Sequence, residues 1–379
     1  MAWTRPRSGP KGLRHTGYYR DPAGRTRSAG TFPDERRALA AAIRAEGKVA
    51  EGTWFDRAAG RITFTDYVET VWWPSLHLEI TTLAGYRSYL DKHFLPHFGP
   101  MPMGDILPSH VQAWVTAALD AGLAPRSVVK YHVLLHGIFK QAVRDRVIPH
   151  NPSADTRLPK VVTKPRRILT PEEFHTLLSQ IPERWLPLVL TDIETGLRWG
   201  ELVALRPRHL DWQRRTITVS ETIVEVSRKH SPTGRRLIAK PYPKDNEPRV
   251  LTVSDDLLTV LAGRVQEYGL GRNDYLFPSV DQRGDHPVSK DTFRNRVWKP
   301  AIDAAGLGFH VRMHDLRHAH ASWLLAGGAD LAAVMERLGH RQITTTQNYL
   351  HALPDADRTA LAAFTRIRQR STGSRDEWS

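Results

Sequence analysis

The pattern of hydrophobic and polar positions changes along the chain, and its first stretch alternates between strand-like segments and turns. From Gly17, short segments containing Tyr, Thr and Phe are separated by the turn sequences Pro-Ala-Gly and Ser-Ala-Gly, which predicts two or three short strands. An Ala-rich stretch from Asp34 to Gly47 then predicts a helix. Residues 1–60 are therefore expected to form a small three-stranded sheet backed by one helix.

Residues 62–150 have the apolar spacing of helices. The clearest helix has apolar positions three, four and seven residues apart: Val128, Tyr131, His132, Leu135, Ile138, Phe139, Ala142 and Val143. Large aromatic residues of this segment stand among other apolar residues and are expected in its core: Trp72, Trp73, Phe94 and Trp114. Residues 151–168 lack apolar periodicity and contain Asn-Pro, Leu-Pro and Lys-Pro-Arg-Arg, which predicts a basic linker.

Residues 169–379 open with a clear helix start. Thr170 is followed by Pro171 and Glu173, which is the pattern of an N-cap with proline in the first turn and a capping box. Helices are predicted at 171–180, 184–195 and 200–205. The segment is expected to be a domain of its own, because the linker before it has no apolar pattern.

A strand pattern interrupts these helices. β-branched residues alternate with polar ones between Thr216 and Val253, which predicts one small antiparallel sheet. Helices return from Ser254, and the last of them is predicted to begin at an N-cap, Asp330, and to end at Gly339. The chain is thus expected to be a multidomain, mainly α-helical protein with a small N-terminal sheet, a helical middle domain and a mixed α+β last domain.

Composition narrows the class of partner. Lys and Arg number 54 against 40 Asp and Glu, so the net charge is +14, which favours a polyanionic partner and nucleic acid first. Cys is absent, which excludes disulfides, thiolate zinc sites and cysteine nucleophiles. The sequence shows neither an export signal nor an apolar stretch of membrane-spanning length, so a cytoplasmic protein without a membrane partner is expected.

Basic residues gather in two places that could contact DNA. The first thirty residues hold seven of them and one acid, Asp21, and the candidates that lie in the predicted strands and turns are Arg20, Arg25 and Arg27. Four more fall between the apolar positions of the clearest helix and form a stripe: Arg126, Lys130, Lys140 and Arg144. The alternatives are a disordered solubilising tail at residues 1–15 and an ordinary solvated helix face.

Three short motifs in the last domain are weak on their own. Gly-Leu-Arg198 carries an acid three residues later, Glu201, at the start of a predicted helix where a guanidinium could help to bind an anion. His314 and Arg317 stand three apart on one helix. Gly339 is followed by His340 and, after a Thr-rich turn, by Tyr349.

Taken in order, these residues resemble the tyrosine recombinase (phage integrase) family. The matching set is Arg198, Glu201, Lys244, His314, Arg317, His340 and Tyr349. Lys240 stands near Lys244 on the same predicted strand region, and Lys244 is preferred because Arg249 follows it at the next strand start.

The resemblance implies a site-specific DNA recombinase that cleaves and rejoins strands through a covalent 3′-phosphotyrosyl intermediate and integrates or excises a mobile element. It also implies an arm-type DNA-binding domain at 1–60, a core-type DNA-binding domain at 62–150 and a catalytic domain at 169–379. The implied partners are double-stranded attachment sites, three further copies of the chain in a tetramer on DNA, and an accessory host factor and excisionase. A longer integrase of this kind exchanges its C-terminal tail, here the part after Leu353, between neighbouring copies.

The chemistry calls for the same residue types. Attack by a phenol on a phosphodiester builds negative charge on the non-bridging oxygens, which two guanidiniums, Arg198 and Arg317, can clamp. Near neutral pH His314 and His340 can donate hydrogen bonds or move protons, and His314 is the candidate base. The 5′ oxygen needs a proton as it leaves, which Lys244 can supply. The phosphotyrosine retains the energy of the bond, so neither nucleotide, metal nor other cofactor is expected.

Two other classes of protein share parts of this pattern. His314 and His318 are four residues apart, as zinc ligands on a helix can be, although Asp315 stands where a metalloprotease would have Glu. A zinc hydrolase is therefore one alternative. A non-catalytic DNA-binding or architectural protein would explain the charge and the helices but not the ordered catalytic set, and within the same chemistry a topoisomerase-like relaxing enzyme is a further alternative.

Overall fold

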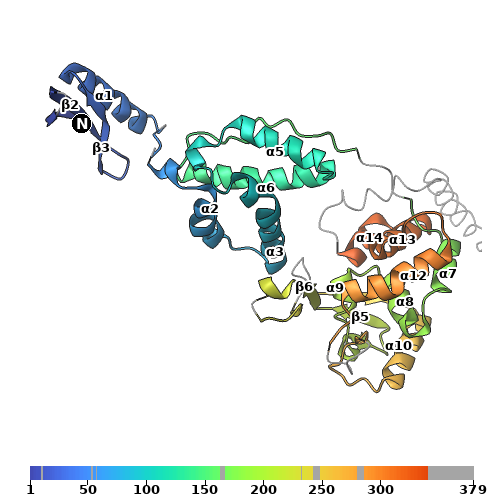
Figure 1. Cartoon of the computed structure of the whole chain (residues 1–379). Helices are drawn as coiled ribbons and strands as arrows, with labels where there is room; N and C mark the ends of the chain where they lie inside the picture. The colour runs from blue at the N-terminus through green and yellow to red at the C-terminus, as the bar shows by residue number, and fades with distance from the viewer. Residues whose placement is uncertain are drawn as a thin grey trace, which may run out of the picture. The chain divides into compact units, whose positions relative to one another are not determined.

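The computed structural model describes residues 1–9, 12–52, 54–56, 58–162, 167–231, 233–241, 248–279 and 286–339. It divides into two compact units, Met1–Val162 and Thr163–Ser379 (Figure 1). No helix in the described part of the chain is long and apolar enough to cross a lipid bilayer.

The first unit begins with a three-stranded antiparallel sheet in the order β1-β2-β3. Its strands are β1 (Trp3–Gly9), β2 (Gly12–Arg20) and β3 (Thr26–Phe32). Helix α1 (Glu35–Ala50) starts at the N-cap Asp34 and packs on the sheet so closely that a Cβ on Gly17 would lie 2.2 Å from the carbonyl oxygen of Ala38. The sheet and helix predicted for residues 1–60 are therefore present. The disordered-tail alternative is wrong for the described part of residues 1–15, because these residues form β1 and the start of β2.

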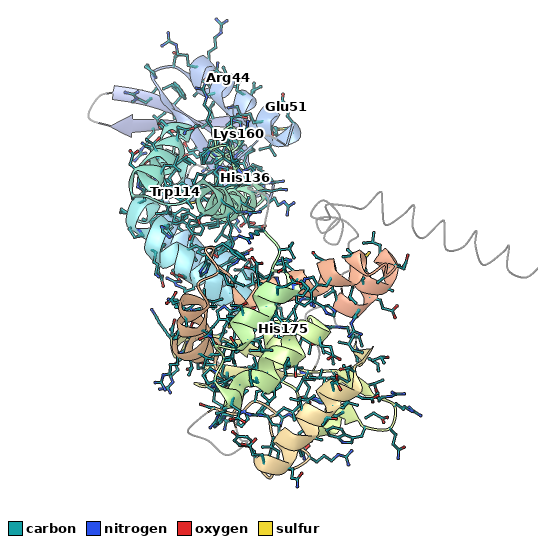
Figure 2. All side chains as sticks on the ribbon, turned by 90° about the vertical axis from the view of Figure 1, so that its right-hand side faces the viewer. Arg44, Glu51, Trp114, His136, Lys160 and His175 are labelled. Carbon is teal, nitrogen blue, oxygen red and sulfur yellow. The ribbon has the colours of Figure 1, made fainter. Side chains whose placement is uncertain are left out.

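The rest of the first unit is helical. Its α-helices are α2 (Phe64–Tyr67), α3 (Ile80–Tyr89), α4 (Leu95–Phe98), α5 (Pro108–Asp120) and α6 (Pro125–Arg144). The core contains Trp72, Phe94 and Trp114 as predicted, and Figure 2 shows Trp114 among these helices. Trp73 is only partly buried and carries the guanidinium of Arg87 over its ring.

The second unit mixes helices with short strands. Its α-helices are α7 (Pro171–Leu178), α8 (Leu186–Thr195), α9 (Trp199–Leu202), α10 (Asp255–Glu267), α11 (Lys290–Phe293), α12 (Lys299–Ala305), α13 (Met313–Ala326) and α14 (Leu331–Leu338). Helix α8 packs against α10 and α13 in the core of the unit, and α13 packs against α14. The capping box at Thr170 and the end of α14 at Gly339 are as predicted.

The antiparallel strands predicted between residues 216 and 253 are present, but they are divided between two small sheets rather than joined in one. The strands are β4 (Leu210–Asp211), β5 (Thr216–Val219), β6 (Thr222–Glu225), β7 (Leu237–Lys240) and β8 (Arg249–Thr252). They form two sheets, β4-β5-β8 and β6-β7, because β5 pairs with the distant β8 and leaves β6 and β7 to pair with each other. Alternation along a strand reveals its two faces but not its partner.

Candidate active site

Arg198 lies in the short connection between α8 and α9. Helix α8 ends at Gly196 in the left-handed conformation, with φ 60°, and Arg198 is the extended N-cap residue of α9. Its Nη1 donates to Oε1 of Glu201 at 3.0 Å, and its Nη2 donates to the carbonyl oxygen of Gly339 at 3.0 Å. The side chain remains 29% exposed, so the guanidinium is held in place while part of it faces solvent.

Glu201 is the buried carboxylate of this cluster, with 1% of its side chain exposed. Its Oε2 accepts from the backbone N–H of Arg198 at 3.0 Å and from Nη2 of Arg249 at 2.6 Å. Burial alone would raise the pKa of Glu201, but the hydrogen bond and charge of Arg249, with the charge of Arg198, hold the pKa below its ordinary value. Glu201 is therefore an ionised bridge between two arginines.

Arg317 is almost fully buried, at 2% exposed. From α13 it donates through Nη1 to the carbonyl oxygen of Gly196 and through Nη2 to that of Leu338, both at 2.6 Å. Asp192 of α8 is buried nearby, and burial raises its pKa well above the ordinary value although the charge of Arg317 opposes this. Burial thus works against the charged form of Asp192, and main-chain oxygens accept hydrogen bonds from Arg317.

The C-terminal turn of α14 draws these groups together. Three successive carbonyl oxygens accept from three different arginines: Arg337 O from Arg249 Nε at 3.2 Å, Leu338 O from Arg317 Nη2 and Gly339 O from Arg198 Nη2. A helix C-terminus leaves its last carbonyls without helical partners and carries partial negative charge, so it favours such cations. The two predicted clamp arginines therefore meet on neighbouring peptide groups.

His314 and His318 lie on the first turns of α13. His314 is exposed, and the two rings contact each other edge to face with centroids 4.9 Å apart. No group of three metal-ligating side chains is found among the described residues. A buried histidine that sequence reasoning missed, His320, lies further along the same helix.

His320 belongs to the support of the site. Its Nε2 accepts from Nε of Arg337 at 3.2 Å, so Nδ1 carries the proton and donates to the carbonyl oxygen of Ile193 at 2.8 Å. Burial, and then the charge of Arg337, lower the pKa of His320 to about 4. Arg337 also donates to the carbonyl oxygens of Thr252 and Glu194, and so fastens α14 to β8 and α8.

Three members of the predicted set, Lys244, His340 and Tyr349, lie outside the described residues. Lys240 ends β7, where it pairs in register with Thr222. Sequence reasoning used Arg249 only to place the lysine, and no sequence signal linked it to Glu201.

The predicted DNA-contacting residues of the first unit differ in exposure. Arg20 and Arg25 are exposed, whereas Arg27 is half-buried in ion pairs with Asp21 at 2.9 Å and Asp56 at 2.7 Å. The four candidates on α6, from Arg126 to Arg144, are all exposed. Arg27 thus anchors its own domain.

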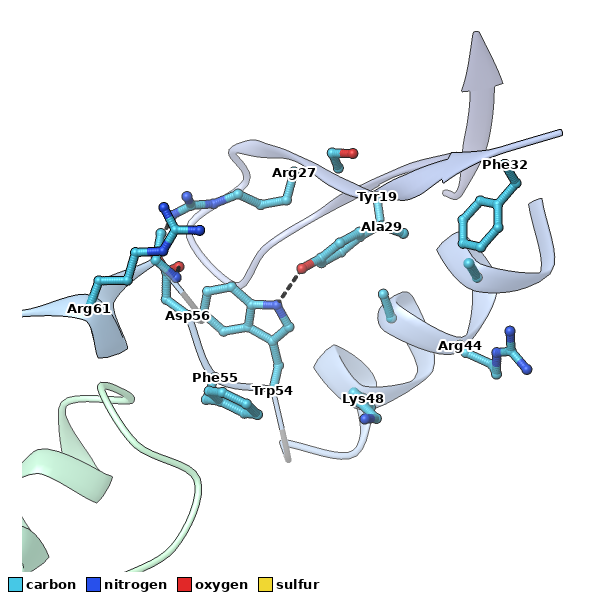
Figure 3. A pocket seen from close by; sticks show the side chains of 14 residues that line it. Tyr19, Arg27, Ala29, Phe32, Arg44, Lys48, Trp54, Phe55, Asp56 and Arg61 are labelled. Carbon is cyan, nitrogen blue, oxygen red and sulfur yellow. Dashed lines mark hydrogen bonds and ion pairs between the residues drawn. The ribbon is translucent and has the colours of Figure 1, made fainter. Parts of the chain in front are cut away.

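That anchor closes one side of a pocket of about 650 Å³ between α1, β3 and the segment after α1 (Figure 3). The indole Nε1 of Trp54 donates to the hydroxyl of Tyr19 at 2.8 Å across it. Arg44 and Lys48 stand at its rim. The pocket therefore joins an aromatic wall to basic side chains, as part of the fold of residues 1–61.

Comparison with known proteins gives two family matches. Residues 167–355 match the Phage integrase family, and residues 63–119 match the Phage integrase N-terminal SAM-like domain. The chain is 28% identical over 311 residues to a prophage phiRv2 integrase of Mycobacterium tuberculosis, which covers 80% of this chain and 78% of that protein. It is 30% identical over 280 residues to the tyrosine recombinase XerC of Xylella fastidiosa, which covers 71% of this chain and 85% of that protein.

A solved structure shares the fold. A lambda integrase, solved as a tetramer bound to a Holliday junction, is similar with a TM-score of 0.57 and 22% identity over 88% of this chain and 92% of that one. Neither the zinc hydrolase nor the non-catalytic DNA-binding alternative is favoured by these relatives. The arginine cluster, the matched segments and the extent of the XerC likeness lead to one assignment: the chain belongs to the phage integrase family and is a tyrosine-type site-specific recombinase.

Proposed function

We propose that this recombinase cleaves double-stranded DNA attachment sites with the phenolic oxygen of Tyr349 and rejoins the strands in a new arrangement. The oxygen attacks the scissile phosphorus, a bond to Tyr349 forms on the 3′ side, and the bond to the 5′ oxygen breaks. The convergence of Arg198 and Arg317 on the turn that precedes His340 carries the proposal. Since the phosphotyrosine conserves the phosphodiester bond energy, attack by another 5′ hydroxyl reverses the step without nucleotide.

The two arginines serve as the clamp for the phosphate. Arg198 presents a partly exposed guanidinium, and Arg317 adds a second positive charge from the interior. Both donate to carbonyl oxygens, which orient a guanidinium without cancelling its charge, and Arg198 also pairs with Glu201. They therefore stabilise the charge that grows on the non-bridging oxygens during attack.

The remaining roles concern protons. A tyrosine of ordinary pKa near 10 is mostly protonated at pH 7, and we assign its proton to the exposed His314, with His340 as a hydrogen-bond donor to the phosphate. Lys244 supplies the proton to the leaving 5′ oxygen. Glu201 holds Arg198 in position.

Four copies of the chain would act on two attachment sites, as in the lambda integrase tetramer to which this fold is similar. The domain of residues 1–60 would bind distal arm sites, the domain of residues 62–150 the core site, and residues 151–168 would link them to the catalytic domain at 169–379. An accessory host factor and an excisionase would set the direction. All of this would take place in the cytoplasm, where the DNA is accessible.

The stripe on α6 gives the core-binding role a physical basis. At 100° per residue, Arg126, Lys130, Lys140 and Arg144 fall on one face, and the exposed Val133 lies between them on the same face. Cations at both ends of about five turns suit contact with phosphates on both sides of a groove. Arg126→Ala and Arg144→Ala should each weaken core-site binding and reduce the slope of log K against log salt by about one. An unchanged slope in both variants would show that the stripe is an ordinary solvated helix face that does not contact DNA.

Covalent trapping tests the proposed reaction. The core site is first identified by selecting, from random duplexes, those that the protein captures in an SDS-stable complex. A nicked duplex with this site should then trap the wild-type protein covalently, whereas Tyr349→Phe should bind the duplex with the same affinity and form no covalent complex. A wild-type level of covalent complex with the Phe variant would move the nucleophile to another residue.

A further inference from the structure

Arg249 reaches the candidate site from a sheet that carries none of the proposed catalytic residues within the described part of the chain. It begins β8, opposite Val219 of β5, and its side chain is 12% exposed. Its Nη2 donates to Glu201 at 2.6 Å and its Nε donates to the carbonyl oxygen of Arg337 at 3.2 Å. A Cβ added to Gly339 would lie 3.2 Å from its Nη1, so the guanidinium also lies against the end of α14.

These contacts connect the two groups that hold the guanidinium of Arg198. Arg198 is fixed by Glu201 on one side and by the carbonyl oxygen of Gly339 on the other. Arg249 holds both supports, because it donates to Glu201 and to the same turn of α14. Removing Arg249 would leave Glu201 with the hydrogen bonds from Arg198.

We propose that Arg249 is a positioning residue for strand cleavage, which sets the orientation of the Arg198 guanidinium through Glu201 and the last turn of α14. The inference rests on the proposed role of Arg198 in clamping the scissile phosphate. A guanidinium is needed because one group must donate in two directions, and an ammonium lacks that planar fork. An error of about 1 Å in a catalytic group can cost about 100-fold in rate, so support of this kind is worth measuring.

The charge of Arg249 gives the role a signature in pH. Burial works to raise the pKa of Glu201, and Arg249 is the group that lowers this pKa most. The elements packed on α9 carry other carboxylates, but Glu194 of α8 accepts from Ser254 and Glu225 of β6 pairs with Arg236. Without Arg249, Glu201 should take up a proton at a higher pH and release Arg198.

The test is single-turnover covalent cleavage of the selected nicked core-site duplex across pH, with the full-length protein. Arg249→Met should cleave about 10- to 100-fold more slowly at neutral pH, bind the duplex as wild type does, and show its acid limb at higher pH. Arg249→Lys retains the positive charge, so its acid limb should stay near that of wild type. Its cleavage rate should lie between the rates of wild type and Arg249→Met. In a Glu201→Gln background, adding Arg249→Met should leave the profile unchanged, because the titrating group is gone.

Arg215→Met is the matched control. Arg215 precedes β5 at the opposite end of the same sheet and pairs with Asp255 at 2.9 Å on the surface, so its loss should alter neither rate nor pH profile. A slower Arg249→Met enzyme with an unshifted acid limb would reduce Arg249 to a structural role. Weaker DNA binding with an unshifted limb would make it a DNA contact instead, and either result overturns the inference. Wild-type protein that forms no covalent complex would overturn the proposed function and this inference together, whereas a normal wild type beside a normal Arg249→Met enzyme overturns the inference alone.

Discussion

A single methyl group on Gly196 should disturb both the backbone and the packing of the candidate site. It ends α8 with φ 60°, and its carbonyl oxygen accepts from Arg317 at 2.6 Å. A Cβ there would lie 2.6 Å from Cδ2 of His320 and 2.9 Å from Cδ2 of Leu338. Gly196→Ala therefore combines a left-handed backbone with a clash against two buried side chains.

The two costs can be separated with a second glycine. A non-glycine residue in the left-handed conformation costs about 1 to 2 kcal/mol, and overpacking a core adds about 1 to 3 kcal/mol. Gly306, which ends α12 at φ 61°, has nothing within 4 Å of its added Cβ, so Gly306→Ala should show the backbone cost alone. For a unit of this size each kcal/mol lowers Tm by about 2 to 4 °C, so roughly 4 to 20 °C is expected for Gly196→Ala and 2 to 8 °C for Gly306→Ala.

Thermal unfolding of the full chain, followed by tryptophan fluorescence, measures both variants against wild type. Cleavage by Gly196→Ala, assayed well below its Tm, should also fall, because the carbonyl that orients Arg317 shifts with the backbone, while Gly306→Ala should cleave normally. Equal losses of Tm in the two variants would show that His320 and Leu338 move aside for the added methyl group without a cost in stability. The packing argument for the site would then be refuted.

Three further outcomes follow from the same structure. Arg198→Ala and Arg317→Ala should each slow single-turnover cleavage by roughly 10³- to 10⁵-fold, with wild-type activity unaffected by EDTA; inhibition reversed by Zn²⁺ or Mg²⁺ would transfer the role to a metal. Removal of residues 1–60 should leave core-site cleavage intact and abolish recombination that needs arm sites, and full recombination by the truncated protein would contradict an arm-binding role. Because the pKa of His320 is lowered to about 4, only the unfolded chain binds its proton between pH 6.5 and 4, so the second unit should lose about 2 kcal/mol of stability from pH 7 to pH 5. His320→Gln should remove that part of the pH dependence in urea unfolding, and an identical dependence would contradict the assigned burial.

The residues that begin and end helices could be predicted from the sequence. Helix caps were predictable because they depend on the residue types at the helix ends themselves. The examples are the capping box at Thr170 and the two ends of α14, Asp330 and Gly339. Strand β1 was missed because it is an exposed edge strand that contains Pro6 and shows no apolar alternation. The pairing of β5 with β8 was missed because register between distant segments depends on the whole fold.

The site itself divides in the same way. The candidate catalytic residues and their order could be proposed from the sequence, since phosphoryl transfer demands particular side chains, and their roles stay a prediction. The groups that hold these side chains could not be predicted, because every residue has a main-chain carbonyl oxygen and the sequence does not show which of them accepts a hydrogen bond. Arg317 donates to the carbonyls of Gly196 and Leu338, and any residues at those positions would offer the same oxygen.

This choice of partner has a functional consequence. Within the described residues, main-chain carbonyl oxygens accept from four guanidiniums, Arg198, Arg249, Arg317 and Arg337, whereas the ionised carboxylate of Glu201 bridges only Arg198 and Arg249. Had carboxylates held all four arginines, the cluster would be neutral, and a phosphate would have to displace a charged competitor to bind. Main-chain carbonyls at the end of α14 satisfy the hydrogen bonds and favour the cations through the helix dipole while leaving the net charge positive. An anionic phosphate that gains further charge in its transition state requires such an excess of positive charge, so the carbonyls that hold the arginines are consistent with the proposed clamp.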